Sequence, residues 1–341
     1  MEPFIQSDTF KVPRDPGRNE PCRCGSGRKF KKCGRPDGWE HPKPASAAPP
    51  SPSTGFSHTA CYARSLEDCS ATLTREHYSS KGVLNTIAGD NTVIRVSGLP
   101  FQGEESVLNL SPDALCGKIL CERHNTALSA IDQTATRLAE ALLELLGLEA
   151  PSVPPRRQFA GQDIEKWLLK KLVGSIAVGN LKIGEQFVPK GHLKPTPELL
   201  SLLFGDAVLL PPWGLYVRGD VHGEGTTPNK AEHGERILLE HDVVLGIMTR
   251  LHAFDFILWM DPSRRPLRSD LRPASIYRPT FVKSPLEYIE LRWPGIEGVH
   301  FTESTVSRVD APAEAGARHF PFGHPTDLNS QQASRIGSAS C

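Results

Sequence analysis

The placement of cysteine is the feature that most constrains this 341-residue chain, because seven of its eight cysteines lie within the first 121 residues. They form two groups, Cys22, Cys24 and Cys33, then Cys61, Cys69, Cys116 and Cys121. In a reducing compartment, close groups of cysteines are more often metal sites than disulfides. The sequence therefore predicts one or two structural Zn²⁺ ions in its N-terminal third.

Charge and hydropathy narrow the class of protein. Lysine plus arginine and aspartate plus glutamate both number 39, so the overall charge favours neither nucleic acid nor a membrane surface. The N-terminus lacks a basic region followed by an apolar stretch, and no apolar run reaches the length of a membrane span. These features predict a soluble, cytoplasmic protein without membrane association.

Local composition suggests several units and an α+β fold. Apolar residues recur at three- and four-residue steps over 126–148 and again over 164–173, which predicts two helices. Beyond Leu200, apolar segments rich in β-branched and aromatic residues alternate with turn residues, which predicts an antiparallel sheet. The expected organisation is a small zinc knuckle (1–43), a flexible linker rich in proline and serine (44–58), a zinc module with a long helix (59–150), a C-terminal α+β domain (151–310) and a disordered tail (311–341).

The first cysteine group lies in GRNEPCRCGSGRKFKKCG, residues 17–34. This stretch resembles the SEC-C motif, the zinc-binding segment of the SecA translocation motor. The resemblance implies that Cys22, Cys24 and Cys33 bind zinc and that the segment contacts a protein partner, as the SecA motif contacts a chaperone. Gly34 stands where the family has its fourth ligand. Three alternatives remain: His41 completes the site, water or a partner completes it, or zinc binds weakly; we favour His41 because structural zinc usually has four protein ligands.

The second group supplies a complete set of ligands. Cys61 and Cys69 open the segment, and Cys121 and His124 close it with a spacing typical of a zinc pair at a helix start. The sequence therefore predicts a Cys3His zinc site. Cys116 is left over, and its apolar neighbours predict a buried thiol.

Two elements within this segment, LTREH and LCERHN, resemble the HNH endonuclease superfamily, a ββα-metal fold whose ends are often clamped by zinc. The resemblance implies a ββα module in which His77 is the general base and Glu76 holds Mg²⁺ or Mn²⁺. It implies that Asn109 orients the base and that Asn125, or else Asp132, completes the metal site.

Two functions follow from these patterns. One is a metal-dependent phosphodiesterase acting on DNA or RNA, consistent with ten basic and four acidic residues between Lys11 and Lys43. The other is a non-catalytic, zinc-stabilised adaptor that binds a protein partner through its knuckle. Two further segments, GDVHGEG (219–225) and the arginine-rich 264–273, are more typical of solvated loops than of sites.

Overall fold

The structure is a computed structural model, and it describes residues 18–20, 29–33, 44–89, 91–96, 107–145, 158–183, 186–191, 193–210, 213–219, 233–240, 243–252, 254–261, 276–277, 281–283 and 288–293. Its helices are α1 (Phe30–Cys33), α2 (Lys81–Ala88), α3 (Glu122–Leu145), α4 (Gly161–Val178) and α5 (Pro197–Phe204), with the 3-10 helices η1 (Arg64–Leu66) and η2 (Pro112–Ala114). Its strands are β1 (Leu73–Glu76), β2 (Ile94–Val96), β3 (Leu108–Leu110), β4 (Gly117–Cys121), β5 (Gln158–Ala160), β6 (Lys182–Ile183), β7 (Gln186–Phe187), β8 (Gly214–Gly219), β9 (His233–Glu240), β10 (Val243–Leu251), β11 (Phe254–Trp259), β12 (Ile276–Tyr277), β13 (Phe281–Lys283) and β14 (Tyr288–Arg292).

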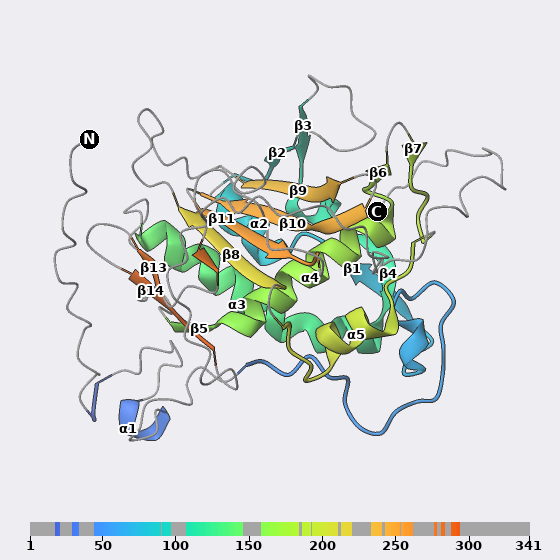
Figure 1. The fold of residues 1–341 in the computed structure, drawn as a ribbon, viewed down its shortest axis with the longest axis horizontal. Coiled ribbons are helices and arrows are strands. Elements are labelled where there is room, and N and C mark those ends of the chain that lie inside the picture. Colours follow the sequence, from blue (N-terminus) through green and yellow to red (C-terminus); the bar gives the residue numbers. More distant parts are fainter. Residues whose placement is uncertain are drawn as a thin grey trace, which may run out of the picture.

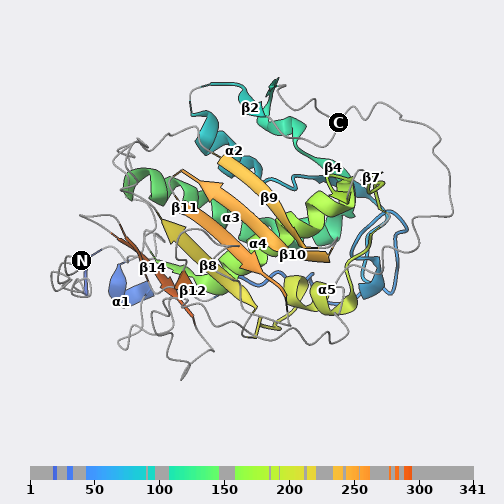
Figure 2. The ribbon, with the colours of Figure 1, turned by 45° about the horizontal axis from the view of Figure 1, so that its top comes forward.

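A five-stranded antiparallel sheet in the order β12-β8-β11-β10-β9 forms the largest layer (Figures 1 and 2). Every residue of β11, the sequence FDFILW, is buried, so this central strand is covered on both faces. Such continuous burial explains why the segment is almost wholly apolar rather than alternating. The α+β class and the antiparallel sheet predicted beyond Leu200 are confirmed.

Helix α4 lies in the middle of the molecule, with β8, β10 and β11 on one side and α3 on the other (Figure 2). It is longer than the predicted helix over 164–173, and almost every one of its side chains is buried. A helix that is buried all round has no solvated face on which to place charges. Its two consecutive lysines, Lys170 and Lys171, are both 0% exposed and therefore need partners inside the protein.

The second cysteine group belongs to a unit of two strands and one helix. Strands β1 and β4 pair antiparallel, and α3 begins directly after β4. The helix starts at Glu122 rather than at 126, because its first turn carries polar residues instead of the apolar residues that marked the predicted start. One cluster of buried side chains runs from Ala47 to Leu291, so the predicted units 59–150 and 151–310 share a core.

The segment predicted to be a flexible linker lies along this core. The backbone N–H of Ala45 donates to Asp163 over 2.7 Å, and Ala47 is 1% exposed. Further along, the N–H of Thr54 donates to Asp68 over 2.8 Å. Residues 44–58 are therefore hydrogen-bonded to other described parts of the chain at Ala45 and at Thr54. None of the described helices combines the length and apolar character that a membrane span requires.

Candidate metal centre and the polar network beside it

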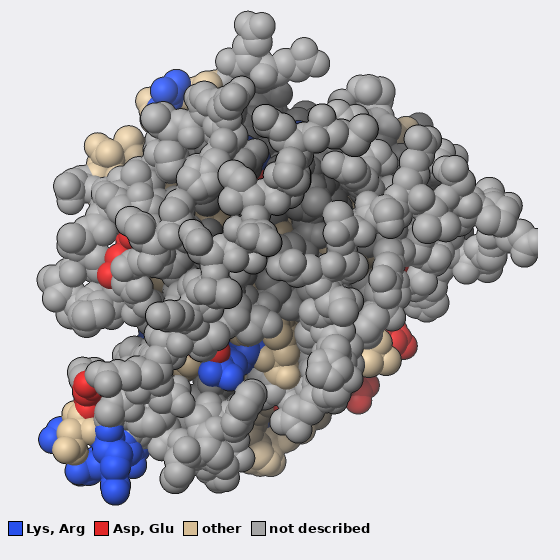
Figure 3. Space-filling model, turned by 60° about the vertical axis from the view of Figure 1, so that its left-hand side comes forward, with Lys and Arg blue, Asp and Glu red and all other residues tan. Residues whose placement is uncertain are grey.

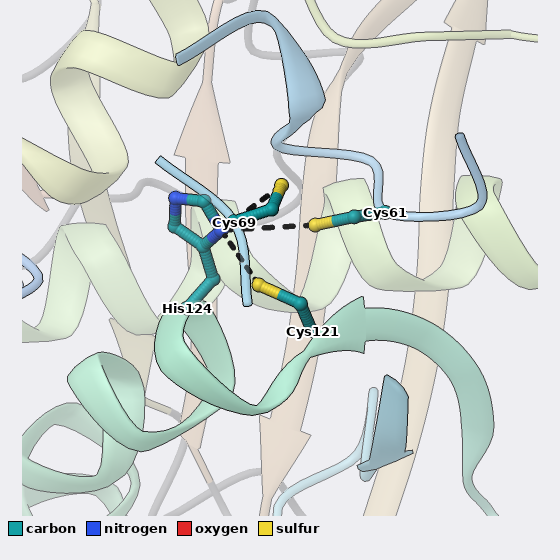
Figure 4. A group of neighbouring side chains, drawn as sticks. All are labelled: Cys61, Cys69, Cys121 and His124. Atoms are coloured by element: carbon teal, nitrogen blue, oxygen red, sulfur yellow. Dashed lines mark hydrogen bonds between the residues drawn. The ribbon is translucent and has the colours of Figure 1, made fainter. Parts of the chain in front are cut away.

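Cys61, Cys69, Cys121 and His124 converge from three segments (Figure 4). Cys61 and Cys69 flank η1, Cys121 is the last residue of β4, and His124 lies in the first turn of α3. The pairing of β1 with β4 brings the first two cysteines close to Cys121 and His124, because Leu73 of β1 lies opposite Cys121. The backbone N–H of Ser70 then donates to the Cys121 sulfur over 3.4 Å.

The spacing of these four side chains suits a tetrahedral ion. Their ligand atoms all lie within 4.8 Å of one another, and all four residues are buried. His124 Nδ1 is 3.7, 3.8 and 3.1 Å from the sulfurs of Cys61, Cys69 and Cys121. Zinc bonds of about 2.3 Å to sulfur and 2.0–2.1 Å to nitrogen give a tetrahedral S···N edge of about 3.5 Å. The cluster can therefore hold a zinc ion with little movement.

The protonation of these groups is coupled to the ion. Burial raises the pKa of the Cys61 and Cys69 thiols, and it lowers the pKa of His124 to about 4. Burial also acts to raise the pKa of Cys121, but backbone N–H groups of His124 and Ser70 donate to this sulfur and the net effect is a lower pKa. A neutral imidazole is ready to bind metal, whereas the buried thiols need the charge of an ion to become thiolates.

Arg123 fastens the loop between the first two cysteines to the start of α3. Its Nε lies 2.8 Å from Asp68, and its guanidinium also donates to the backbone oxygens of Pro50 and Pro52. The ring of His124 packs against Phe204 of α5, with 5.0 Å between ring centroids. The four clustered residues are thus held by contacts of Arg123 with the cysteine loop and of His124 with α5.

A second polar centre lies at the end of β1. Glu76 is 1% exposed, and its Oε1 forms an ion pair with the ammonium of Lys170 at 2.6 Å. The same Nζ lies 2.7 and 2.9 Å from the two carboxylate oxygens of Asp132, and it donates to the backbone oxygen of His77 at 3.0 Å. Glu76 and Asp132, both named from the sequence as metal ligands, therefore converge on one point, and a lysine of α4 occupies it.

Ser80 and Trp167 extend this network. Ser80 donates to Asp132 over 2.5 Å and accepts from the indole Nε1 of Trp167 over 2.9 Å. Lys171 lies over the Trp167 ring at 4.7 Å and pairs with Glu235 of β9 at 2.5 Å. The network joins the strand-and-helix unit to the large sheet.

The other residues predicted to be catalytic, His77, Asn125 and Asn109, lie in three different environments. His77 Nε2 lies 3.5 Å from Asp113 of η2, and burial lowers the pKa of His77, which favours the neutral imidazole. Asn125 donates to Thr74 Oγ1 and to the backbone oxygen of Arg75, so it ties α3 to β1. Asn109 is exposed in β3, where it pairs with Arg95 of β2, so the structure places it in a separate hairpin.

The ionisation of the buried Glu76 can be tested by measuring stability as a function of pH. Burial, only partly opposed by Lys170, raises its pKa from 4.5 to about 7. Folded Glu76 therefore keeps a proton between pH 4.5 and 7 that the unfolded chain releases, and its contribution to stability falls as pH rises through this window. Because Gln does not titrate, we expect Glu76→Gln to gain stability relative to wild type from pH 4.5 to 7, by up to roughly 3 kcal/mol.

Urea unfolding of zinc-saturated protein across this pH range measures the difference. Glu67→Gln, at an exposed position, is the control for loss of a charge. A difference between Glu76→Gln and wild type that does not vary with pH would mean that Glu76 is ionised throughout.

Lys170 is the residue that the sequence interpretation missed. The helix predicted over 164–173 contains Lys170 and Lys171, to which its apolar pattern assigns no role. The available signal was the apolar character of the whole segment, which is unusual for a helix with one face in water. A charged pair inside such a helix indicates buried carboxylates elsewhere in the chain.

A separate cavity of about 580 Å³ lies between residues 44–46, α4 and the segment after α5. Its walls include Leu169 and Leu209, and two of its charged residues, Glu165 and Lys166, are engaged within the protein. Glu165 accepts from the N–H of Leu215 at 2.9 Å, and Lys166 donates to the backbone oxygen of Gly205 at 2.6 Å. The cavity therefore offers mainly apolar surface and does not adjoin the metal ligands.

Most of the first cysteine group lies outside the described residues, including Cys22, Cys24 and His41, as do 219–225 except for Gly219, 264–273 and 311–341. Cys33 ends α1, and the backbone N–H of Lys31 donates to Arg18 across this segment at 3.0 Å. Cys116 is buried, 8% exposed, and is not one of the four clustered ligands.

The SEC-C motif family matches residues 18–33, a small share of the chain. No curated protein and no solved structure matches the chain. The chain thus carries a SEC-C motif and, separately, a Cys3His group that can hold zinc.

Proposed function

We propose that this protein is a zinc-stabilised adaptor whose SEC-C segment binds a protein partner, and that its strand-and-helix unit is a scaffold rather than a nuclease. The observation that carries this proposal is the position of Lys170. Its ammonium fills the space between Glu76 and Asp132, where a nuclease of the HNH type would need a divalent cation. A fixed positive charge there opposes binding of a second cation.

The SEC-C segment supports the adaptor role by its charge. Arg18, Lys29, Lys31 and Lys32 are exposed around α1, with Glu20 as the acidic residue among the described positions. Lysine and arginine side chains also gather at the lower edge of the view in Figure 3, on the side where α1 lies. Such a cluster attracts an acidic surface, so we propose a partner that presents carboxylates.

Cross-linking of the purified chain in extracts tests this role by charge reversal. We expect Lys29→Glu, Lys31→Glu and Lys32→Glu together to abolish a specific cross-linked species that wild type forms. The matched control reverses three exposed lysines elsewhere, Lys118, Lys190 and Lys194, and should leave that species intact. Equal loss in both triple variants, or no specific species with wild type, would reject the adaptor role.

A metal-dependent phosphodiesterase acting on DNA or RNA is the second candidate. It is favoured by one arrangement, the neutral His77 imidazole at the end of a strand whose neighbouring carboxylate, Glu76, converges with Asp132. In this role His77 would take the proton from the attacking water. We expect no cleavage of single- or double-stranded DNA or RNA with Mg²⁺ or Mn²⁺. Cleavage that is lost in His77→Ala would establish the nuclease and exclude the scaffold.

A further inference from the structure

We propose that the Lys170 ammonium is a built-in substitute for a divalent cation, and that the oxygens around it form a latent Mg²⁺ or Mn²⁺ site that removal of this side chain exposes. This inference deepens the scaffold proposal, on which it rests. It concerns what the site can bind, whereas the adaptor role concerns the SEC-C segment, so the two can fail separately.

The surroundings of the ammonium have the composition of a hard-cation site. Four oxygens lie 2.6 to 3.0 Å from Lys170 Nζ: one from Glu76, two from Asp132 and the backbone oxygen of His77. Carboxylate and carbonyl oxygens are the donors that Mg²⁺, Mn²⁺ and Ca²⁺ prefer. They come from the end of β1 and from α3, two elements joined by the pairing of β1 with β4 and by Asn125.

The ammonium itself is the independent sign that this place attracts a cation. Lys170 is 0% exposed, and a lone buried ammonium is costly unless carboxylates surround it. Ser80 helps to fix the acceptors, because its hydroxyl donates to the Asp132 oxygen that faces Nζ. The Asp132 carboxylate is thus held by a group other than the lysine.

One of the ligands of this site borders solvent. The Asp132 side chain is 29% exposed, whereas Glu76 is 2% exposed, so one ligand faces solvent and the other faces the core. Mg²⁺ and Mn²⁺ usually keep several waters and bind through one or two carboxylates. Lys170→Ala leaves the two carboxylates in place and removes the competing charge.

The test measures Mn²⁺ binding to zinc-saturated protein by electron paramagnetic resonance and thermal unfolding. We expect Lys170→Ala to bind one Mn²⁺ per chain more than wild type. At Mn²⁺ a hundredfold above the dissociation constant, its Tm should rise by about 5–10 °C, while that of wild type should not change. Lys170→Ala combined with Asp132→Asn should lose most of this response.

A second variant covers the outcome in which Lys170→Ala fails to fold. Lys170→Gln keeps a side chain of similar length with a hydrogen-bond donor, and it should also gain Mn²⁺ binding, more weakly than Lys170→Ala. If neither variant binds additional Mn²⁺, the inference is overturned. It is equally overturned if both stay unfolded in millimolar Mn²⁺, because an ion able to replace the ammonium should restore the fold.

Discussion

Replacing Cys121 with serine should remove one zinc per chain and leave a protein without a cooperative unfolding transition. Cys121 ends β4, its sulfur is 3.1 Å from His124 Nδ1, and it is one of the four clustered residues. Structural zinc contributes about 10–16 kcal/mol of apparent binding free energy in small zinc domains. That contribution matches or exceeds the total stability of about 5–15 kcal/mol that a typical protein has.

Zinc content and thermal unfolding followed by circular dichroism measure this effect. Cys116→Ser is the matched control, because Cys116 is also a buried cysteine of the same segment but is not one of the clustered ligands. The control should keep its full zinc content and lose at most about 1–3 kcal/mol. A Cys121→Ser protein that retains the zinc content and Tm of wild type would contradict a metal centre at this place.

The Cys3His cluster could be predicted from the sequence because the types and spacing of its residues are those of zinc ligands. Cys121 and His124 are three positions apart at a helix start, and Cys61 and Cys69 are the remaining ligands upstream that no other group uses. Thiols and an imidazole at such spacings have few roles besides metal binding. The structure adds the pairing of β1 with β4, which brings the segments that carry Cys69 and Cys121 together.

The partner of Glu76 could not be predicted in this way. Lys170 lies 93 positions from His77 and 38 from Asp132 along the chain, and no local pattern records such a pairing. The parallel pairing of β5 with β14 is similar, because it joins residues 158–160 to residues 290–292 across the whole C-terminal region. Both features depend on how α4 packs between α3 and the large sheet, which is a property of the tertiary fold.

The difference between local spacing and contacts made by the tertiary fold also explains why a resemblance of motifs is a weaker guide to catalysis than to metal binding. Glu76 ends β1, His77 directly follows it, and Asn125 lies in the first turn of α3. Asn125, however, is engaged by Thr74 and Arg75, and Glu76 by Lys170. The motif fixes which residues are near one another, whereas contacts from a distant helix decide what these residues can bind.

At pH 8, above the pKa of about 7 of Glu76, Lys170→Met should destabilise the protein by about 3–5 kcal/mol, because it leaves the buried Glu76 carboxylate without its cation. Lys170→Met with Glu76→Leu should recover most of this loss, since an apolar pair of similar volume requires no charge inside the core. The Asp132 side chain, 29% exposed, keeps access to water and to Ser80 in the double variant. Urea unfolding of the four proteins of this cycle gives the coupling energy directly.

The exposed ion pair between Lys81 and Asp113 is the matched control. Its Nζ–Oδ1 distance of 2.7 Å is close to the 2.6 Å between Lys170 and Glu76, but the two side chains are 47% and 56% exposed. Lys81→Met should therefore change stability by at most about 1 kcal/mol. If Lys170→Met cost no more than Lys81→Met, the ammonium would not be what holds β1, α3 and α4 together, and both the scaffold and its built-in cation would lose their main support.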